Sequence, residues 1–521
     1  MKELTSSLYD FERLINGDYL YVDKTEYVWE MVRHPYACYF LSRPRRFGKS
    51  LLLSTLKAVF EGKRELFKGL ALYDKPYDWQ QYPVIHIDLG DCCVHNESEL
   101  RRYLTDKLRD IAESFDIKLT VRLSQLSGSF SRLIAKLANQ GRQVVVLIDE
   151  YDKPILENIT RADDIGAIRD TLADFYSPLK TQQSYERFVF LTGVSKFCHV
   201  SIFSKLNNLT DITMDARFAT MLGYTQEEFE NNFAEYIAQT EANQNLPHEQ
   251  YLDKIKRWYD GFRFHAKADT VYNPVSLANF FTNCGEFNNY WFATGTTSFL
   301  IELIKQQKFD FEEILKEPVS QIAFSAYDVN NLEILPLLMQ TGYLTINHVQ
   351  QNDDETLYYL DFPNLEVKEG FQTYLINAYT KATKESIEVK VRRLKRFVRE
   401  GDVDGFMQCL QSLLAGIPYS IQIKEEKDYQ TVVFLIFTLL GVYTTAEAQT
   451  NTGRIDAVAA CDNYVYIFEF KLNKSEEVAF DQIMARQYYQ KYQNCGKQIV
   501  LIGANFDFEK RQIDGWKTKL M

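Results

Sequence analysis

Residues 41–50 read Leu41-Ser42-Arg43-Pro44-Arg45-Arg46-Phe47-Gly48-Lys49-Ser50 and end in the Gly-Lys-Ser of a phosphate-binding loop. The apolar segment 36–41 predicts a buried strand before the loop, and residues 51–60 carry apolar side chains on one helical face. Between such a strand and helix, backbone N–H groups and the helix N-terminus bind phosphate. The sequence therefore predicts a nucleotide site in which Lys49 reaches the β- and γ-phosphates and Ser50 ligates Mg²⁺.

Arg43 departs from the usual motif, G-x-x-x-x-G-K-[S/T], because it stands where the first glycine belongs. That glycine lets the backbone turn sharply beside phosphate, whereas Pro44 fixes φ and removes a donor. We therefore expect a loop built differently, in which Arg45 or Arg46 makes charge-assisted contacts to phosphate. The alternative is a lysine that lies near a helix start without binding a ligand.

A second apolar run, residues 143–148, leads into the two acids Asp149 and Glu150. A buried parallel strand delivers acids to the C-terminal edge of its sheet in this way. We assign Asp149 to Mg²⁺ and Glu150 to the general base that polarises the attacking water, against the alternative of two solvated acids at a strand end. The residues expected to bind the nucleotide and its metal are Arg45, Arg46, Phe47, Gly48, Lys49, Ser50, Leu51 and Asp149.

The C-terminal quarter contains a second candidate catalytic site. Segments 452–458 and 463–471 predict a hairpin, and Glu469 and Lys471 project from one face because they differ by two positions. Asp456 on the neighbouring strand can meet them. We expect Asp456 and Glu469 to hold Mg²⁺ or Mn²⁺ and Lys471 to orient or deprotonate water, which predicts metal-dependent phosphodiester hydrolysis.

Three polar residues are candidates to complete this second site. Glu425 or Glu426 opens an apolar helix over 429–440 and would add a ligand, and Gln482 on the following helix would line the cleft. The alternative reading is a set of polar residues on the solvated face of a hairpin.

The motifs that carry a family resemblance cover nearly the whole chain. They are Tyr21-Val22-Asp23-Lys24-Thr25, residues 43–50, Ile148-Asp149-Glu150-Tyr151-Asp152-Lys153-Pro154, Leu191-Thr192-Gly193-Val194-Ser195-Lys196-Phe197, Trp258-Tyr259-Asp260-Gly261-Phe262, Tyr272-Asn273-Pro274-Val275-Ser276, Gly453-Arg454-Ile455-Asp456 and Glu469-Phe470-Lys471. With them the chain resembles the bacterial and archaeal AAA-ATPase-like proteins that carry a C-terminal nuclease domain of the PD-(D/E)XK superfamily. The resemblance implies ATP binding and a nuclease fold, and it makes Arg43 the family's own form of the loop.

The expected fold class is α/β, in three domains. Residues 1–222 alternate strand and helix and predict an AAA-ATPase-like P-loop NTPase domain with a parallel sheet. Residues 223–385 predict a helical lid followed by a winged-helix-like region, and residues 386–521 predict the PD-(D/E)XK nuclease-like domain, which is restriction-endonuclease-like α/β. Asp23-x-x-Glu26 is expected to form a capping box at the start of a helix.

Composition and charge are those expected of a cytoplasmic protein. No apolar run is long enough to span a bilayer, and the eight cysteines have no C-x-x-C spacing, which suits reduced thiols. The chain carries a net charge of −12, but residues 386–521 contain 18 Lys+Arg and 17 Asp+Glu, or +1, which leaves −13 for the rest. The ATPase part is therefore not a general nucleic-acid binder. The basic stretch 390–399 predicts either a helix that follows a phosphate backbone or a solvated linker helix.

The residues favour an ATP-binding, ATP-hydrolysing protein whose nucleotide state controls a metal-dependent nuclease acting on nucleic acid. The alternative is an ATP-driven switch whose nuclease-like domain is catalytically inactive and only binds. Thr192 or Ser195 is expected to sense the γ-phosphate, and residues 258–262 are the expected lever between the two activities. A homo-oligomer would let a neighbouring subunit supply an arginine finger.

Overall fold

The structure is a computed structural model that describes residues 1–159, 162–196, 206, 208–244, 246–291, 300–301, 303–304, 315, 317–320, 324, 334–352, 355–380, 384–414, 436, 443–450, 453–461, 463–493, 495–507, 510 and 512–521. The chain divides into two compact units, one of residues 1–304 and 317–367 and the other of residues 305–316 and 368–521. The division falls within helix α16 (Leu365–Thr380). The three domain boundaries expected from the sequence are finer than this division and stay a prediction. Among the described helices, none is both long and apolar enough to cross a membrane.

A parallel sheet forms the centre of the nucleotide-binding part of the first unit. Its strand order is β2-β3-β4-β1-β5, and each neighbouring pair is parallel. The strands are β1 (Ala37–Ser42), β2 (Val84–Asp88), β3 (Val144–Asp149), β4 (Glu186–Gly193) and β5 (Thr210–Asp211). Every residue of β3 and β4 is buried, since helices cover both faces of the sheet.

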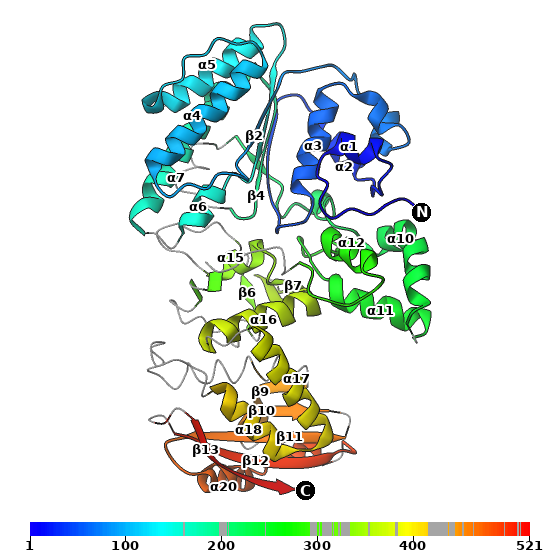
Figure 1. Ribbon diagram of the computed structural model, residues 1–521, viewed down its shortest axis with the longest axis vertical. Helices are drawn as coiled ribbons and strands as arrows, with labels where there is room; N and C mark the ends of the chain where they lie inside the picture. The colour runs from blue at the N-terminus through cyan, green and yellow to red at the C-terminus, as the bar shows by residue number, and fades with distance from the viewer. Residues whose placement is uncertain are drawn as a thin grey trace. The chain divides into compact units, whose positions relative to one another are not determined.

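Figure 1 shows α3 on one side of this sheet, with α4, α5 and α7 on the other. These helices are α3 (Lys49–Phe60), α4 (Glu97–Ser114), α5 (Leu126–Ala138) and α7 (Ala162–Tyr176), and α1 (Phe11–Asn16) and α2 (Thr25–Val32) lie beside α3. The expected buried strands before the loop and before the two acids, and the helix after the loop, are confirmed.

The helical part that follows has an aromatic core. Helices α10 (Gln226–Glu241), α11 (His248–Tyr259) and α12 (Pro274–Thr282) bury phenylalanine and tyrosine rings against one another. Thr225 and Glu228 form a capping box at the start of α10. Lys24 reaches across to Glu228 at 2.6 Å and joins this part to the N-terminal segment. The prediction of a capping box at Asp23 is wrong, because α2 begins at Thr25, so Asp23 is not its N-cap residue. The Asp23 carboxylate instead accepts hydrogen bonds from Thr25 and from the backbone N–H of Ala71.

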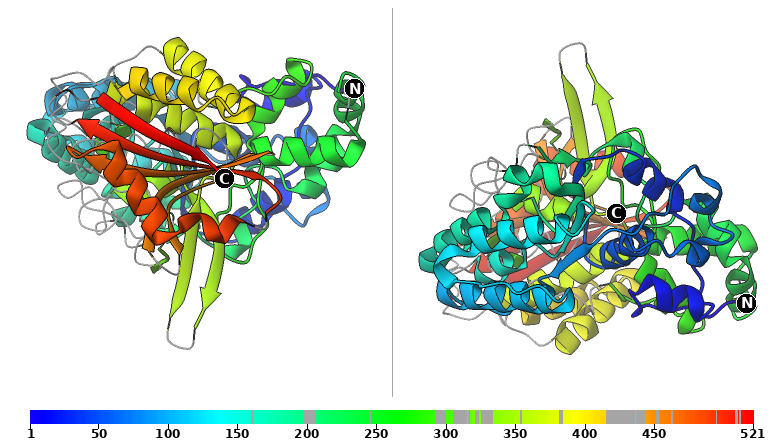
Figure 2. Two further views of the ribbon diagram at one scale, coloured as in Figure 1. Left: turned by 90° about the horizontal axis from the view of Figure 1, so that it is seen from below. Right: turned by 90° about the horizontal axis from the view of Figure 1, so that it is seen from above.

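The winged-helix-like element comes next in the chain. It consists of α15 (Ile334–Gln340), β7 (Thr345–Gln351), β8 (Thr356–Asp361) and α16, and β6 (Val319–Ser320) adds an edge to give the sheet order β6-β8-β7. The order helix, strand, strand, helix expected from the sequence is confirmed. Figure 2 shows the β7–β8 hairpin, in yellow-green, standing out from the helices of its own unit.

The second unit is built on a mixed sheet of order β13-β12-β11-β10-β9. Its strands are β9 (Tyr443–Thr450), β10 (Gly453–Ala460), β11 (Tyr464–Leu472), β12 (Gln498–Asp507) and β13 (Gln512–Leu520), and only β11 and β12 pair in parallel. Helices α17 (Lys384–Glu400) and α18 (Val403–Leu414) cover one face and α20 (Glu476–Arg486) covers the other (Figure 2). The helix expected over 429–440 lies outside the described residues.

Candidate nucleotide and nuclease sites

The phosphate-binding loop joins the end of β1 to α3, which begins at Lys49. Gly48 precedes the helix with φ +89°, in the left-handed region that favours glycine. Lys49 is 6% exposed, and its ammonium donates to the carbonyl oxygens of Arg43 and Pro44, both at 3.0 Å. Burial lowers the pKa of Lys49, and nearby carboxylates oppose that effect. The Lys49 side chain thus folds back against the backbone of the loop.

The two acids lie at the end of β3, next to this loop. The Asp149 side chain is 2% exposed and accepts a hydrogen bond from the Ser50 hydroxyl. Burial raises the pKa of Asp149 to about 6, whereas the hydrogen bond from Ser50 and the charge of Lys49 act in the opposite direction. Glu150 has φ +47° and donates its backbone N–H to Asp149 Oδ1 at 2.9 Å. A hydroxyl and a carboxylate in contact are the pair that a shared Mg²⁺ needs.

Arg43 has a structural place in the loop. Its guanidinium is fully buried and donates to the carbonyl oxygens of Ser42 at 2.9 Å, Thr213 at 2.7 Å and Phe218 at 3.1 Å. The guanidinium carbon also lies 4.1 Å from the ring centroid of Phe264. The residue that replaces the consensus glycine therefore joins the loop to the chain that follows β5.

The other loop residues contact the helical part of the first unit. The Arg45 carbonyl accepts from Trp291 Nε1 at 3.0 Å. The Phe47 ring packs edge-on against Phe262, with centroids 4.8 Å apart. Phe262 belongs to the segment that the sequence singled out as a lever. The structure thus brings that segment against the loop, and its role as a lever stays a prediction.

A cavity of about 110 Å³ adjoins the loop between the N-terminal segment and the start of the helical part. Arg46 contacts the Tyr9 hydroxyl at this cavity. Residues from four segments line it, among them Tyr9, Phe47, Leu51, Met221, Tyr224 and Val275. The cavity lies beside the phosphate-binding loop, where the base of a bound nucleotide would approach, but its volume is below the roughly 150 Å³ that encloses benzene in another protein, so it does not enclose a nucleobase in this structure.

The two hydroxyls expected to sense the γ-phosphate already have protein partners. Thr192 Oγ1 donates to the Leu41 carbonyl at 2.8 Å, and Ser195 Oγ donates to Asp152 Oδ2 at 2.6 Å. Asp152 is buried and also accepts the backbone N–H groups of Val194 and Ser195. It ties the turn after β3 to the end of β4. This role of Asp152 was not predicted from the sequence, although an acid two residues after Glu150 was the available signal.

The second site lies on the α20 face of the other sheet. Glu469 is 1% exposed, and its Oε1 accepts from Lys471 Nζ at 2.7 Å and from the amide of Gln482. Gln482 also meets the Tyr488 hydroxyl at 3.4 Å. The structure therefore brings Glu469, Lys471 and Gln482 together, as the sequence predicted.

Asp456 lies on β10, next to β11. Ala457 pairs with Phe468 in the antiparallel ladder, so the register continued by one residue places position 456 opposite position 469. The Asp456 side chain is outside the described part of the chain, as are Glu425 and Glu426. An oxygen donor set of this kind fits Mg²⁺ or Mn²⁺, which are hard cations.

The basic helix α17 lies on the opposite face of the same sheet. Its apolar side is buried at Val391, Leu394 and Val398, and the Tyr466 hydroxyl donates to the Val398 carbonyl at 2.7 Å. Residues 466 and 469 have opposite parity on β11, so α17 and the Glu469 site are separated by the sheet. The helix is thus a packed element of its unit rather than a solvated linker, and a role of its basic side in following a phosphate backbone stays a prediction.

Two family models match the chain. Residues 6–203 match a predicted AAA-ATPase, and residues 424–516 match the PD-(D/E)XK nuclease superfamily. A relative from Azotobacter chroococcum mcd 1, described as an uncharacterized protein in the vnfD 5′ region, is 34% identical over 525 residues that cover 99% of this chain and 98% of that protein. The chain belongs to the AAA-ATPase-like family with a C-terminal PD-(D/E)XK nuclease superfamily domain.

Solved structures similar to this AAA-ATPase-like protein include two archaeal proteins. The Aeropyrum pernix ORC1 protein in complex with DNA is 10% identical, with 67% of this chain and 91% of that chain covered and a TM-score of 0.27. The Aeropyrum pernix ORC2 protein, in ADPNP–ADP complexes, is 10% identical, with 71% and 98% covered and a TM-score of 0.28. The fold class expected for the AAA-ATPase-like family is confirmed by the five-stranded parallel sheet and the mixed C-terminal sheet.

Proposed function

We propose that this AAA-ATPase-like protein binds and hydrolyses ATP and that its nucleotide state controls a metal-dependent nuclease in the same chain. The observation that carries the nuclease part is the Glu469 carboxylate, which is almost fully buried yet held by Lys471 and Gln482. Burying a carboxylate costs free energy of desolvation, and a buried acid paired with a lysine within the segment that matches the nuclease superfamily supports a catalytic role for it.

ATP would bind across the loop and the small cavity beside it. Its phosphates would meet Lys49 and the N-terminus of α3, and its base would lie at the opening of the cavity lined by Tyr9 and Tyr224. Ser50 and Asp149, already in contact, would hold the Mg²⁺. Glu150 would take the proton of the attacking water.

At the second site, Asp456 and Glu469 would hold Mg²⁺ or Mn²⁺. The metal supplies a Lewis acid for the phosphodiester when it is bound. Lys471 would orient the water or accept its proton, and Gln482 fixes the Glu469 carboxylate by its hydrogen bond. The substrate would be nucleic acid.

Control by nucleotide needs a physical connection that begins at the loop. Trp291 Nε1 donates to the Arg45 carbonyl, and the backbone N–H of Trp291 donates to Glu366 Oε1 at 2.5 Å. Glu366 is buried in the first turn of α16 and also accepts from Ser276 at 2.7 Å. Two hydrogen bonds thus lead from the loop to the helix that runs into the second unit. A change in the loop on nucleotide binding would bias the position of α16.

The test is a cleavage assay with labelled single- and double-stranded DNA and RNA, in which ATP and Mg²⁺ or Mn²⁺ are varied independently. We expect at least one of these substrates to be cut by the wild type and not by Lys471→Ala. Lys474→Ala is the matched control, because it removes an exposed lysine three residues away. No cleavage of any substrate under any condition, with ATP hydrolysis intact, would favour the inactive nuclease-like binding domain instead.

A further inference from the structure

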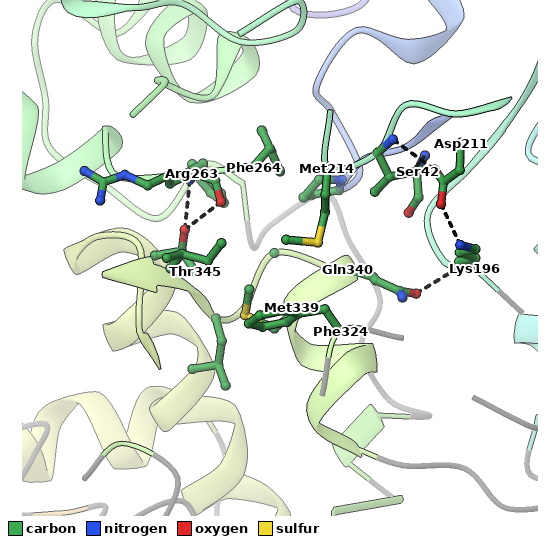
Figure 3. Close-up of a pocket in the computed structure, with 16 residues that line it drawn as sticks. Ser42, Lys196, Asp211, Met214, Arg263, Phe264, Phe324, Met339, Gln340 and Thr345 are labelled. Carbon is green, nitrogen blue, oxygen red and sulfur yellow. Dashed lines mark hydrogen bonds and ion pairs between the residues drawn. The ribbon is translucent and has the colours of Figure 1, made fainter. Parts of the chain in front are cut away.

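A second, larger cavity in the first unit also adjoins the phosphate-binding loop. It has a volume of about 250 Å³ and lies between the C-terminal ends of β1, β4 and β5 and the winged-helix-like element. Figure 3 shows its walls, which come from segments far apart in the sequence. Ser42 and Pro44 of the loop form one wall, and Gln340 and Thr345 lie across from them.

The size of this cavity limits what can fill it. An engineered cavity of about 150 Å³ in another protein binds benzene, and drug-sized ligands take roughly 300–1,000 Å³. The volume of about 250 Å³ therefore suits a bicyclic ring or a ring with one small substituent.

The middle of the cavity is lined by flat and polarisable side chains. Phe262, Phe264 and Phe324 contribute rings, and Met214 and Met339 contribute thioethers. Aromatic rings and thioether sulfur both gain contact energy with a planar π system. This lining favours an aromatic ligand over an aliphatic one.

Polar groups lie on two sides of the cavity: Arg263 and Thr345 on one side, joined by hydrogen bonds between the Arg263 backbone and the Thr345 hydroxyl, and Lys196, Asp211 and Gln340 on the other, where the groups that would meet the edge of the ligand lie. Lys196 forms an ion pair with Asp211 at 2.6 Å, and its backbone N–H donates to Gln340 Oε1 at 2.7 Å (Figure 3). The Gln340 amide NH₂ has no partner among the described residues, and the Lys196 ammonium has further hydrogens beyond the one given to Asp211. The unused groups are donors, so the ligand must present acceptors. The ion pair neutralises this side, so the ligand is itself neutral there.

We propose that this cavity binds a nucleobase, at a site separate from the ATP site. A nucleobase is planar and neutral, has the right size and carries ring nitrogens and carbonyl oxygens at its edge. The ring would stack among Phe264, Met214 and Met339, and its acceptors would meet the Gln340 amide and the Lys196 ammonium. The base comes either from a free nucleoside or from a nucleic-acid strand.

The experiment uses the full chain with excess Mg-ADP, which fills the ATP site. Guanosine and uridine are titrated by calorimetry, as are a single-stranded hexanucleotide and its abasic counterpart. We expect saturable 1:1 binding of a nucleoside, or tighter binding of the base-bearing strand than of the abasic strand. The first result assigns the base to a free nucleoside, and the second assigns it to nucleic acid. If neither kind of binding is seen up to millimolar concentration, the proposal is overturned.

Two variants locate the binding. Met339→Trp fills the cavity and should weaken binding at least tenfold, and Gln340→Leu removes a neutral donor and should weaken it about three- to tenfold. Gln351→Leu changes an exposed glutamine at the end of β7 that does not line the cavity, and it should have no effect. If Met339→Trp fails to fold, Gln340→Leu decides alone. Binding that neither cavity variant weakens would overturn the assignment to this cavity.

Discussion

Restoring the consensus glycine of the phosphate-binding loop should damage this protein. Motif reasoning alone expects Arg43→Gly to make the loop a better phosphate site. The structure predicts the opposite, because the fully buried Arg43 guanidinium donates to three carbonyl oxygens, two of which, on Thr213 and Phe218, belong to a distant part of the chain. The substitution would remove all three bonds and leave three carbonyls without this donor.

The size of the effect follows from those bonds. Hydrogen bonds from a charged donor contribute roughly 1.5–3 kcal/mol each after desolvation, so three would sum to about 4–9 kcal/mol. Burial lowers the pKa of Arg43 to about 9, which shows that desolvation of its charge is substantial and argues for the lower end. We expect a loss of about 4 kcal/mol in the free energy of unfolding, a large part of the roughly 5–15 kcal/mol that holds a domain together.

The assay is urea unfolding followed by tryptophan fluorescence. Four of the five tryptophans lie in the first unit, so the signal reports mainly on it. Arg122→Gly is the matched control, since it replaces an exposed arginine and carries the same backbone entropy cost. ATP binding is measured on both variants. A free energy of unfolding for Arg43→Gly within about 1 kcal/mol of the control, or tighter ATP binding, would refute the reasoning.

Four further outcomes are expected. Glu150→Gln should keep ATP binding and lose turnover by about 10²-fold, seen as phosphate release; turnover at the wild-type rate would remove Glu150 as the base. Lys471→Ala should abolish cleavage with ATP hydrolysis intact on the same preparation, and loss of both activities would point to misfolding. Gly261→Ala should destabilise the first unit by about 2 kcal/mol or more in the same unfolding assay, because φ is +105° and a Cβ would overlap the Pro363 carbonyl; a change below about 0.5 kcal/mol would contradict this. Glu186→Gln should flatten the pH dependence of stability. Burial raises the Glu186 pKa from 4.5 to about 8. Between these values the folded protein keeps the Glu186 proton that the unfolded chain has lost, so the free energy of unfolding falls by about 1.4 kcal/mol per pH unit as pH rises. The same slope in Glu186→Gln as in the wild type would count against this role of Glu186.

The elements around both sites could be predicted because their signals are local. The strand before the loop, the helix that begins at Lys49 and the acids at the end of β3 each follow from a short run of apolar residues and its boundary. The same holds for Glu469 and Lys471, whose spacing of two puts them on one face of a strand. Gln482 could be placed beside them because a helix follows that strand directly.

The role of Arg43 could not be predicted, since its partners are far away in the sequence. Thr213 and Phe218 lie 170 and 175 residues further along, and nothing near Arg43 indicates that their carbonyls will surround it. The contact of Trp291 with the loop spans an even longer separation, 246 residues. The capping box at Asp23 failed for a related reason, because that carboxylate is taken by the backbone of Ala71.

The basic helix α17 shows a different limit. Its periodicity correctly gives the buried side at Val391, Leu394 and Val398. Which surface that side covers depends on the whole sheet, and it proves to be the face opposite Glu469. Sequence periodicity identifies an apolar side but not its partner.

Control of the nuclease by nucleotide is tested most directly by cleavage rates of the wild type and Lys49→Ala, each with ATP, with ADP and without nucleotide. A coupling free energy of about 1.4 kcal/mol is a factor of ten. We predict that the wild-type rate differs by at least about tenfold between nucleotide states and that the Lys49→Ala rate is the same in all three. Identical wild-type rates in every condition would show that the two sites share a chain without sharing control.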